Sequence, residues 1–173
     1  MKRQFLFFMF TGLMMFLMQG VACAAENSPK AESRSLKSSV KADYLLITCI
    51  DFRLRDEVCA YMSGRGLGDQ YDELVIPGVA LGVDKYESWK KAFFSQLDII
   101  KKLHGIKTVM LLEHRDCGMY SYVFGKDVVG TGAHEADVHL KEMQKFKQEI
   151  LKRHPDLKVE LLLMAVDGKV ETL

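Results

Sequence analysis

Four short runs of apolar residues without polar alternation lie along the chain, at 44–47, 74–76, 109–112 and 161–164. A strand that is buried on both faces carries such a run, because helices cover the two faces of a parallel sheet. The four runs therefore predict the parallel strands of one sheet.

Apolar residues between these runs recur at three- and four-residue steps, the spacing that puts them on one face of a helix. The clearest stripe consists of Tyr86, Trp89, Phe93, Leu97 and Ile100. A second helix is expected from about residue 134 to 154, because Pro155 would end it there. Its stripe consists of Ala136, Leu140, Met143, Phe146 and Ile150. We assign both stripes to the core, where apolar side chains at helical spacing usually lie.

Strands that alternate with helices predict an α/β fold with right-handed crossovers between the strands. We expect a mostly parallel central sheet of four to five strands flanked by helices. Residues 43–173 form a single domain in this interpretation, because a segment of this length buries one core and shows no internal repeat.

The N-terminus has the features of a secretory signal peptide. Lys2 and Arg3 precede an apolar run over 5–17, and the small residues Ala22-Cys23-Ala24 follow. We predict that residues 1–24 are removed and that the mature protein is periplasmic or secreted, without membrane contact after cleavage.

Two other interpretations of this segment stay open. Residues 5–25 are close to the ~20 residues that a retained membrane anchor needs, and Cys23 is a candidate for lipidation after export. The segment 25–42 is rich in Ser and Lys and lacks apolar periodicity, which predicts a flexible linker before the domain.

The charge of the chain is nearly balanced, with 24 basic and 23 acidic residues. Proteins that bind nucleic acids usually carry a basic excess or a basic face. The composition therefore predicts no nucleic-acid partner.

Three cysteines remain after the predicted cleavage: Cys49, Cys59 and Cys117. An odd number is a poor basis for a disulfide framework, although disulfides form readily outside the cytosol. A bound soft metal gives thiols a reason to persist there, because it holds them as thiolates. We expect Cys59 to pack as a small buried apolar residue.

Two short motifs follow two of the predicted strands. Cys49-Ile50-Asp51-Phe52-Arg53 follows the first strand and, if extended, puts Cys49, Asp51 and Arg53 on one face. His114-Arg115-Asp116-Cys117 follows the third apolar run. Open parallel sheets collect ligands beyond the carboxyl ends of their strands. Two thiolates and an imidazole suit zinc, and three protein ligands leave the fourth tetrahedral position open for catalysis.

The sequence resembles the β-class carbonic anhydrases, a family marked by a CxDxR segment and, after a later strand, an HxxC segment. These segments are residues 49–53 and 114–117 here. The resemblance begins near Asp43 and extends to residues 167–172, which are similar to the closing strand pair of the family.

The resemblance implies roles for five residues. Zn²⁺ would be bound by Cys49, His114 and Cys117. Asp51 would accept a hydrogen bond from water at the metal, and Arg53 would hold Asp51 ionised and oriented. In some members of the family the aspartate moves onto the zinc, so Asp51 is either a gate or a helper.

The activity implied by the resemblance is the reversible hydration of carbon dioxide to bicarbonate by zinc-activated water. The implied partners are this small-molecule substrate and further copies of the chain, in a homodimer or a higher homo-oligomer. Related proteins hydrolyse carbonyl sulfide or carbon disulfide with the same three ligands, so a sulfur-analogue hydrolase is one alternative. A zinc-binding protein without turnover is another.

The sequence departs from the family pattern at two places. Pro-Gly-Val-Ala at residues 77–80 replaces the usual Arg-Asn-Ala-Gly, and Met119 replaces a glycine. By resemblance, both places lie near the substrate pocket and the dimer contact. The departures therefore bear on substrate identity and oligomeric geometry more than on metal binding.

A second metal site is a hypothesis for the start of the helix expected at 134–154. Glu135 and His139 stand four residues apart and would share one face, with His134 and Asp137 beside them. The competing interpretation is a solvent-exposed helix face.

Overall fold

The computed structural model of this protein describes residues 41–173. The predicted signal peptide and most of the predicted linker lie outside this part of the chain, so they stay predictions. No helix within residues 41–173 is long and apolar enough to cross a bilayer.

A five-stranded sheet in the order β2-β1-β3-β4-β5 forms the centre of the domain. Its strands are β1 Tyr44–Thr48, β2 Tyr71–Val75, β3 Thr108–His114, β4 Lys158–Met164 and β5 Val170–Thr172. The first four strands are parallel, and β5 pairs with β4 in the antiparallel direction. The predicted sheet is confirmed, including the closing strand pair at the C-terminus.

The second strand begins earlier than the apolar run at 74–76 predicted. Strand β2 starts at Tyr71, and its first four residues are only half-buried. It lies at the edge of the sheet beside β1, where solvent reaches one flank of the strand. Polar residues are therefore tolerated there. Asp72 and Glu73 interrupt the apolar pattern, so the beginning of the strand shows no apolar run.

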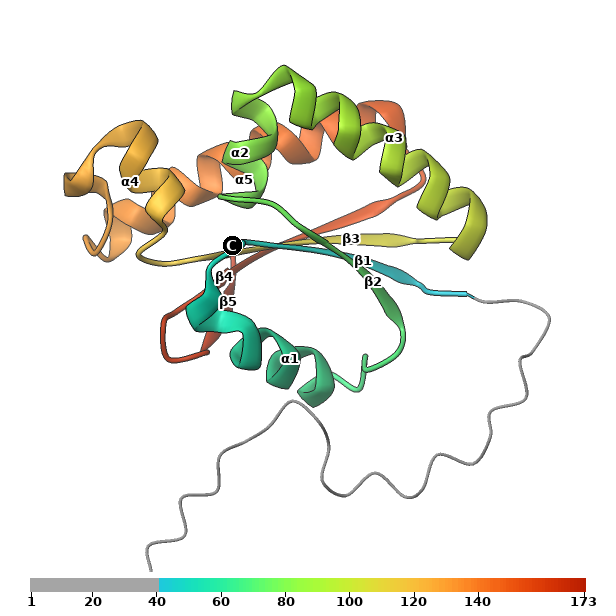
Figure 1. Ribbon diagram of the computed structural model, residues 1–173, viewed down its shortest axis with the longest axis horizontal. Helices are drawn as coiled ribbons and strands as arrows, with labels where there is room; N and C mark the ends of the chain where they lie inside the picture. The colour runs from blue at the N-terminus through green and yellow to red at the C-terminus, as the bar shows by residue number, and fades with distance from the viewer. Residues whose placement is uncertain (1–40) are drawn as a thin grey trace, which may run out of the picture.

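Helices cover both faces of the sheet (Figure 1). One face carries α2 (Val79–Lys85), α3 (Glu87–His104) and α5 (Ala133–Arg153). The other face carries α1 (Arg55–Gly64), which the short 3-10 helix η1 (Phe52–Leu54) precedes. Helix α4 (Gly118–Phe124) and the 3-10 helix η2 (Lys126–Val128) lie beyond the carboxyl end of β3.

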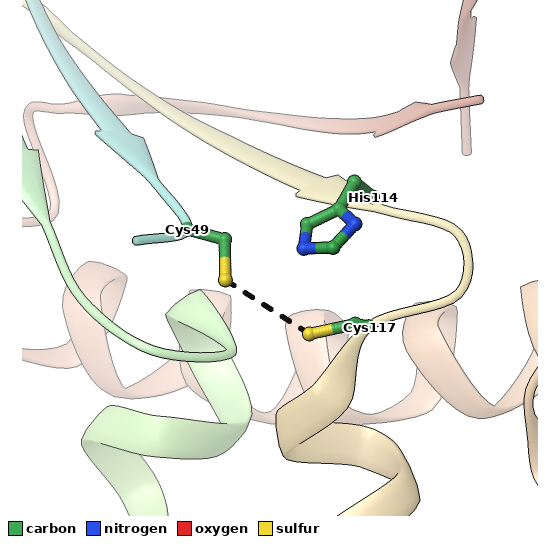
Figure 2. Close-up of side chains that lie close together, drawn as sticks. All are labelled: Cys49, His114 and Cys117. Atoms are coloured by element: carbon green, nitrogen blue, oxygen red, sulfur yellow. Dashed lines mark hydrogen bonds between the residues drawn. The ribbon is translucent and has the colours of Figure 1, made fainter. Parts of the chain in front are cut away.

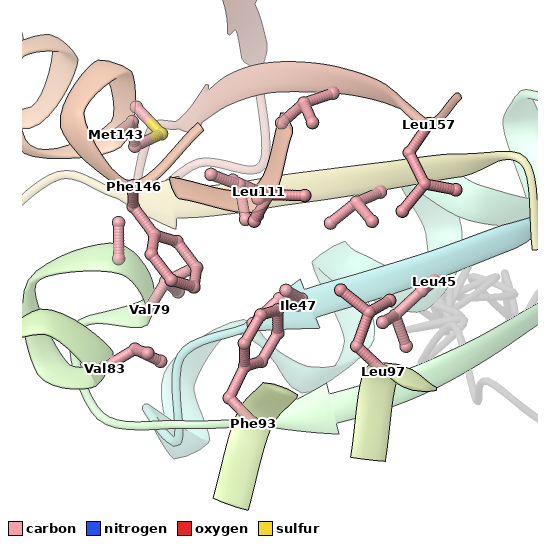
Figure 3. Packing of buried hydrophobic residues seen from close by; sticks show 14 of the residues in the cluster. Leu45, Ile47, Val79, Val83, Phe93, Leu97, Leu111, Met143, Phe146 and Leu157 are labelled. Atoms are coloured by element: carbon pink, nitrogen blue, oxygen red, sulfur yellow. The ribbon is translucent and has the colours of Figure 1, made fainter. Parts of the chain in front are cut away.

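Alternate residues of the central strands serve two separate cores. Leu45, Ile47, Val109 and Leu111 belong to the core beneath α2, α3 and α5, which also holds Phe93 and Phe146 (Figure 3). The intervening residues Leu46, Met110 and Leu112 belong to the core beneath α1. Each fully buried side chain of this kind stabilises the fold by about 1.5–3 kcal/mol. Burial on both faces is the physical reason for the continuous apolar runs.

Helix α1 turns its apolar face to the sheet through Val58 and Met62, which are buried one turn apart. Cys59 follows Val58 and so points about 100° away around the helix. It is half-buried and lies outside the cores. The prediction that Cys59 packs as a buried apolar residue is therefore wrong.

The topology brings the two sequence motifs together. Strand β1 pairs directly with β3, so that Thr48 lies opposite Leu112. Cys49 follows Thr48, and His114 is the last residue of β3. Both motifs thus reach the same edge of the sheet, beyond the carboxyl ends of two neighbouring strands.

Candidate metal centre

Cys49, His114 and Cys117 converge at this edge of the sheet (Figure 2). Among residues 41–173 they form the one group of potential metal ligands, with donor atoms all within 4.8 Å of one another. Each donor comes from a different structural element: the end of β1, the end of β3, and the residue that caps α4. The arrangement predicted from the two motifs is present.

The spacing of the two sulfurs suits a shared ion. Two thiolates that each lie about 2.3 Å from one tetrahedral ion are about 3.8 Å apart. The Sγ atoms of Cys49 and Cys117 are 3.9 Å apart. A disulfide would bring them to about 2.05 Å, so the two cysteines are free thiols.

His114 presents one ring nitrogen to the site. Its Nδ1 lies 2.8 Å from the backbone oxygen of Arg115, which can accept a hydrogen bond from it and so leave a lone pair on Nε2. The Nε2 atom is buried and has no hydrogen-bond partner among the residues that the structure describes. A buried nitrogen beside two sulfurs, without a partner of its own, fits a metal ligand.

The two thiols perturb each other strongly. The pKa of Cys49 is lowered to about 4, chiefly because the Cys117 thiol donates a hydrogen bond to it. The hydrogen bond to Cys49 and burial both raise the pKa of Cys117. The pair therefore holds one proton between its two sulfurs, at a place where a cation can replace that proton.

Asp51 and Arg53 lie beside the three donors, as predicted, although the chain reaches them by a different route. Asp51 caps the 3-10 helix and accepts a hydrogen bond from the backbone N–H of Arg53, so this segment is a turn and not an extended strand. Ile50 and Phe52 still point away, with 62% and 85% of their surface exposed.

The Arg53 guanidinium holds Asp51 and the second motif at the same time. Its Nη2 and Nε donate to the Asp51 carboxylate at 2.7 and 3.0 Å, and its Nη1 donates to Asp116 Oδ2 at 2.8 Å. The hydrogen bonds from Arg53 lower the pKa of Asp51 to about 2. Asp51 Oδ2 lies 3.8 Å from His114 Nε2, so an ionised carboxylate stands next to the donor atoms.

A cavity of about 10 Å³ lies next to Asp51 and His114, with Thr48 and Leu54 also in its wall. This volume is at the lower limit for one water molecule. The cavity adjoins a carboxylate that can accept a hydrogen bond.

Asp116 and Glu113 were missed in the sequence as carboxylates near the site, and Glu135 was interpreted there only as a ligand of a second metal. The Asp116 carboxylate accepts a hydrogen bond from Arg53. Glu135 accepts a hydrogen bond from the Asp116 backbone N–H at 2.6 Å. Glu113 lies directly before His114 in β3. Glu113 and Glu135 are each only 1% exposed. One signal was available, because a lone Glu at the end of an apolar strand needs buried partners.

The hypothesis of a second metal site at the start of α5 is wrong for this part of the chain. Glu135 and His139 do share a buried face, but Glu135 contacts the Asp116 loop and His139 Nδ1 lies 2.5 Å from Glu113. His134 and Asp137 are exposed to solvent. The buried face therefore contacts the residues that surround the Cys49–His114–Cys117 site and does not bind a separate ion.

Comparison with known proteins agrees with this geometry. Residues 39–173 match the family described as "Putative carbonic anhydrase". The chain belongs to this carbonic anhydrase family. The resemblance to the β-class enzymes that the two motifs indicated is thereby confirmed.

Two bacterial relatives of this carbonic anhydrase family member are uncharacterized proteins. The one from Rickettsia conorii is 36% identical over 146 residues, which cover 83% of this chain and 78% of the relative. The one from Rickettsia bellii is 36% identical over 140 residues, which cover 80% of this chain and 85% of the relative.

Solved carbonic anhydrases share the fold. The enzyme of Streptococcus mutans aligns with a TM-score of 0.51 at 17% identity, over 78% of this chain and 82% of that one. The enzyme of Glaciozyma antarctica aligns with a TM-score of 0.52 at 20% identity, over 82% of this chain and 87% of that one.

The two departures from the family pattern contact each other. Gly78, within the Pro-Gly-Val-Ala segment, lies against the side chain of Met119. The Gly78 backbone N–H also donates to Cys49 Sγ at 3.3 Å. The altered segments thus form one wall of the candidate metal centre in this member of the carbonic anhydrase family.

Proposed function

We propose that this protein is a zinc-dependent carbonic anhydrase that interconverts carbon dioxide and bicarbonate. One observation supports this proposal above the others: two sulfurs 3.9 Å apart lie beside a His114 Nε2 atom that has no hydrogen-bond partner within residues 41–173. Two thiolates and one imidazole suit Zn²⁺ and leave one tetrahedral position for water.

The donor set fits zinc better than magnesium or calcium. Magnesium and calcium prefer oxygen ligands, whereas thiolate and imidazole suit zinc. Cys49, His114 and Cys117 would hold the ion, and zinc supplies the Lewis acidity that makes water nucleophilic at neutral pH.

The chain supplies the groups that orient a water molecule. Asp51 is ionised above a pH of about 2, so its carboxylate accepts a hydrogen bond and directs a lone pair of the water toward the substrate. Arg53 fixes the orientation of this carboxylate through two of its nitrogens. The small cavity beside Asp51 and His114 supports the presence of water there.

An apolar cluster includes Cys117 and packs against Cys49. Leu81, Cys117 and Tyr120 are buried there, and Met119 and Val123 pack against them. Carbon dioxide is apolar and makes few hydrogen bonds, so a wall of this kind can admit it without leaving polar groups unpaired.

The test is metal analysis of the purified protein combined with stopped-flow measurement of carbon dioxide hydration. We expect one zinc per chain and hydration that disappears with the metal and returns with added zinc. Carbonyl sulfide and carbon disulfide serve as parallel substrates, because the wall formed by Gly78 and Met119 departs from the family pattern. Turnover of these two alone would assign a sulfur-analogue hydrolase, and a zinc-loaded protein without any turnover would refute the enzymatic proposal.

Self-association is part of the proposal. Phe52 and Ile50 expose 85% and 62% of their surface directly beside the metal-binding segment. A second copy of the chain would remove this apolar surface from water. Light scattering after size exclusion should give at least twice the mass of one chain, and a Phe52→Glu variant should shift the protein toward the monomer.

Export to the periplasm or the exterior is also proposed, on the basis of residues 1–24. The mature protein should begin near residue 25 in intact mass spectrometry of material from the exported fraction. A protein that keeps its first residues in the cytosolic fraction would refute export.

A further inference from the structure

Glu113 is a buried carboxylate directly before the metal-ligand candidate His114. Only 1% of its surface is exposed. Burial of a carboxylate is unfavourable unless hydrogen bonds compensate it. Glu113 Oε1 accepts from the Ala80 backbone N–H at 3.0 Å, and Oε2 accepts from the Tyr120 hydroxyl at 2.6 Å. The same Oε2 lies 2.5 Å from His139 Nδ1.

These three contacts come from three different helices. Ala80 lies in α2, Tyr120 in α4 and His139 in α5. The Tyr120 and His139 rings also stack, with 3.7 Å between their centroids. One side chain of β3 therefore connects the three helices at the point where the strand ends.

Two of these helices begin at the sulfurs. The Gly78 N–H, two residues before Ala80, donates to Cys49 Sγ at 3.3 Å. The backbone N–H groups of Met119 and Tyr120 face Cys117, where they act to lower its pKa against the stronger effects that raise it. Gly78 caps α2 and Ala80 is its second residue, so the bond from Ala80 to Glu113 restrains the backbone that carries the Gly78 N–H.

The turn before α2 needs such a restraint. Val79 has a φ of 45°, a conformation that β-branched residues rarely adopt. Strained backbone of this kind persists when surrounding contacts hold it. Val79 is fully buried, and its neighbours in the chain bond to Cys49 and Glu113.

We propose that Glu113 is a positioning residue for the metal centre, which keeps the Gly78 N–H on the Cys49 sulfur by anchoring Ala80. A hydrogen bond to a metal thiolate withdraws electron density from the sulfur and so makes the metal a stronger Lewis acid. This inference rests on the metal binding proposed above and adds the residue that tunes it.

Cadmium NMR tests the geometry without relying on activity. In ¹⁵N-labelled protein loaded with ¹¹³Cd, the Gly78 amide proton should show a scalar correlation to cadmium through the N–H···S bond. Glu113→Leu removes the acceptor for Ala80 and should abolish this correlation while cadmium stays bound. Glu113→Gln keeps an oxygen for Ala80 and should retain the correlation.

Leu97→Ala is the control for a general loss of stability, because Leu97 is fully buried in the core beneath α3. This variant should keep the Gly78 correlation. A Glu113→Leu protein with an unchanged Gly78 correlation and an unchanged ¹¹³Cd shift would overturn the inference.

The wild-type protein provides a second measurement if Glu113→Leu does not fold. Hydrogen exchange of the Gly78 and Ala80 amides should be slow and should follow one common opening reaction. Absence of the Gly78 correlation from cadmium-loaded wild type, or fast exchange of Ala80, would overturn the positioning role. Failure of cadmium to bind the wild type at all would instead refute the proposed metal centre.

Discussion

Met119 lies so close to Gly78 that a Cβ atom at position 78 would be 2.5 Å from Met119 Cγ. Gly78 also has a φ of 67°, which L-residues with a Cβ atom rarely adopt. The two departures from the family pattern therefore depend on each other, because a methionine at 119 needs a glycine at 78.

A double-mutant cycle tests this dependence. Gly78→Ala should destabilise the protein by about 2 kcal/mol or more, because the new Cβ atom meets both a strained φ and the methionine side chain. Combining Gly78→Ala with Met119→Gly should recover the stability lost to the clash with the methionine. The stability lost to the unfavourable φ should not return. Chemical unfolding measures both variants, and strictly additive effects would contradict the contact.

Loss of one sulfur should remove the metal. Cys117→Ser is expected to abolish both zinc content and hydration, because the remaining two ligands form a weak site. A chelator should lower the unfolding temperature of the wild type but not that of the variant, since bound metal stabilises only the folded state. Cys59→Ser changes a cysteine on α1 outside the group of three donors and should retain zinc. Full zinc content in Cys117→Ser would falsify the ligand assignment.

The Asp51 carboxylate determines one part of the pH dependence of the stability of the fold. A carboxyl group with a lowered pKa in the folded state stabilises the fold above its unfolded pKa, about 3.9. That contribution is lost as the pH falls through the folded pKa, which is about 2 for Asp51. The unfolding temperature of the wild type should therefore converge with that of Asp51→Asn as the pH falls from about 4 to about 2.

The same low pKa predicts the behaviour of turnover. Asp51 stays ionised from pH 5 to 9, so it should add no limb to the pH–rate profile in that range. Asp51→Asn should keep its zinc and lower the hydration rate at every pH. Unchanged hydration in this variant would remove Asp51 from the mechanism.

Asp116 combines two roles that substitutions can separate. It has a φ of 57° and receives Arg53 through its carboxylate. Asp116→Ala should destabilise the protein by about 1 kcal/mol more than Asp116→Gly, because only glycine adopts this φ without cost. Both variants should lower turnover alike if Arg53 needs its second anchor. Normal turnover in both would limit Asp116 to a structural role, and Asp116→Asn is the control that keeps an acceptor.

Local patterns in the sequence were sufficient for the four parallel strands and the long helices, whereas the closing strand was expected only from the family resemblance. Leu45, Leu46 and Ile47 are fully buried because β1 has a core on each side, and an uninterrupted apolar run is the local trace of that environment. Phe93 and Leu97 on α3 are buried in one core only, and their four-residue spacing is the local trace of one buried helix face. The beginning of the edge strand β2 at Tyr71 was not predicted, because half-exposed positions impose no apolar pattern.

Local sequence was enough to choose the candidate donors. Cys49 follows β1, His114 ends β3 and Cys117 comes three residues later, and the parallel pairing of β1 with β3 brings these positions together. The surroundings of those candidate donors depend instead on contacts between residues far apart in the chain. Glu113 meets Ala80 across 33 positions, and Arg53 meets Asp116 across 63. Such contacts leave no periodic trace in a sequence, because each depends on how separate elements pack and not on the spacing of residues within one of them.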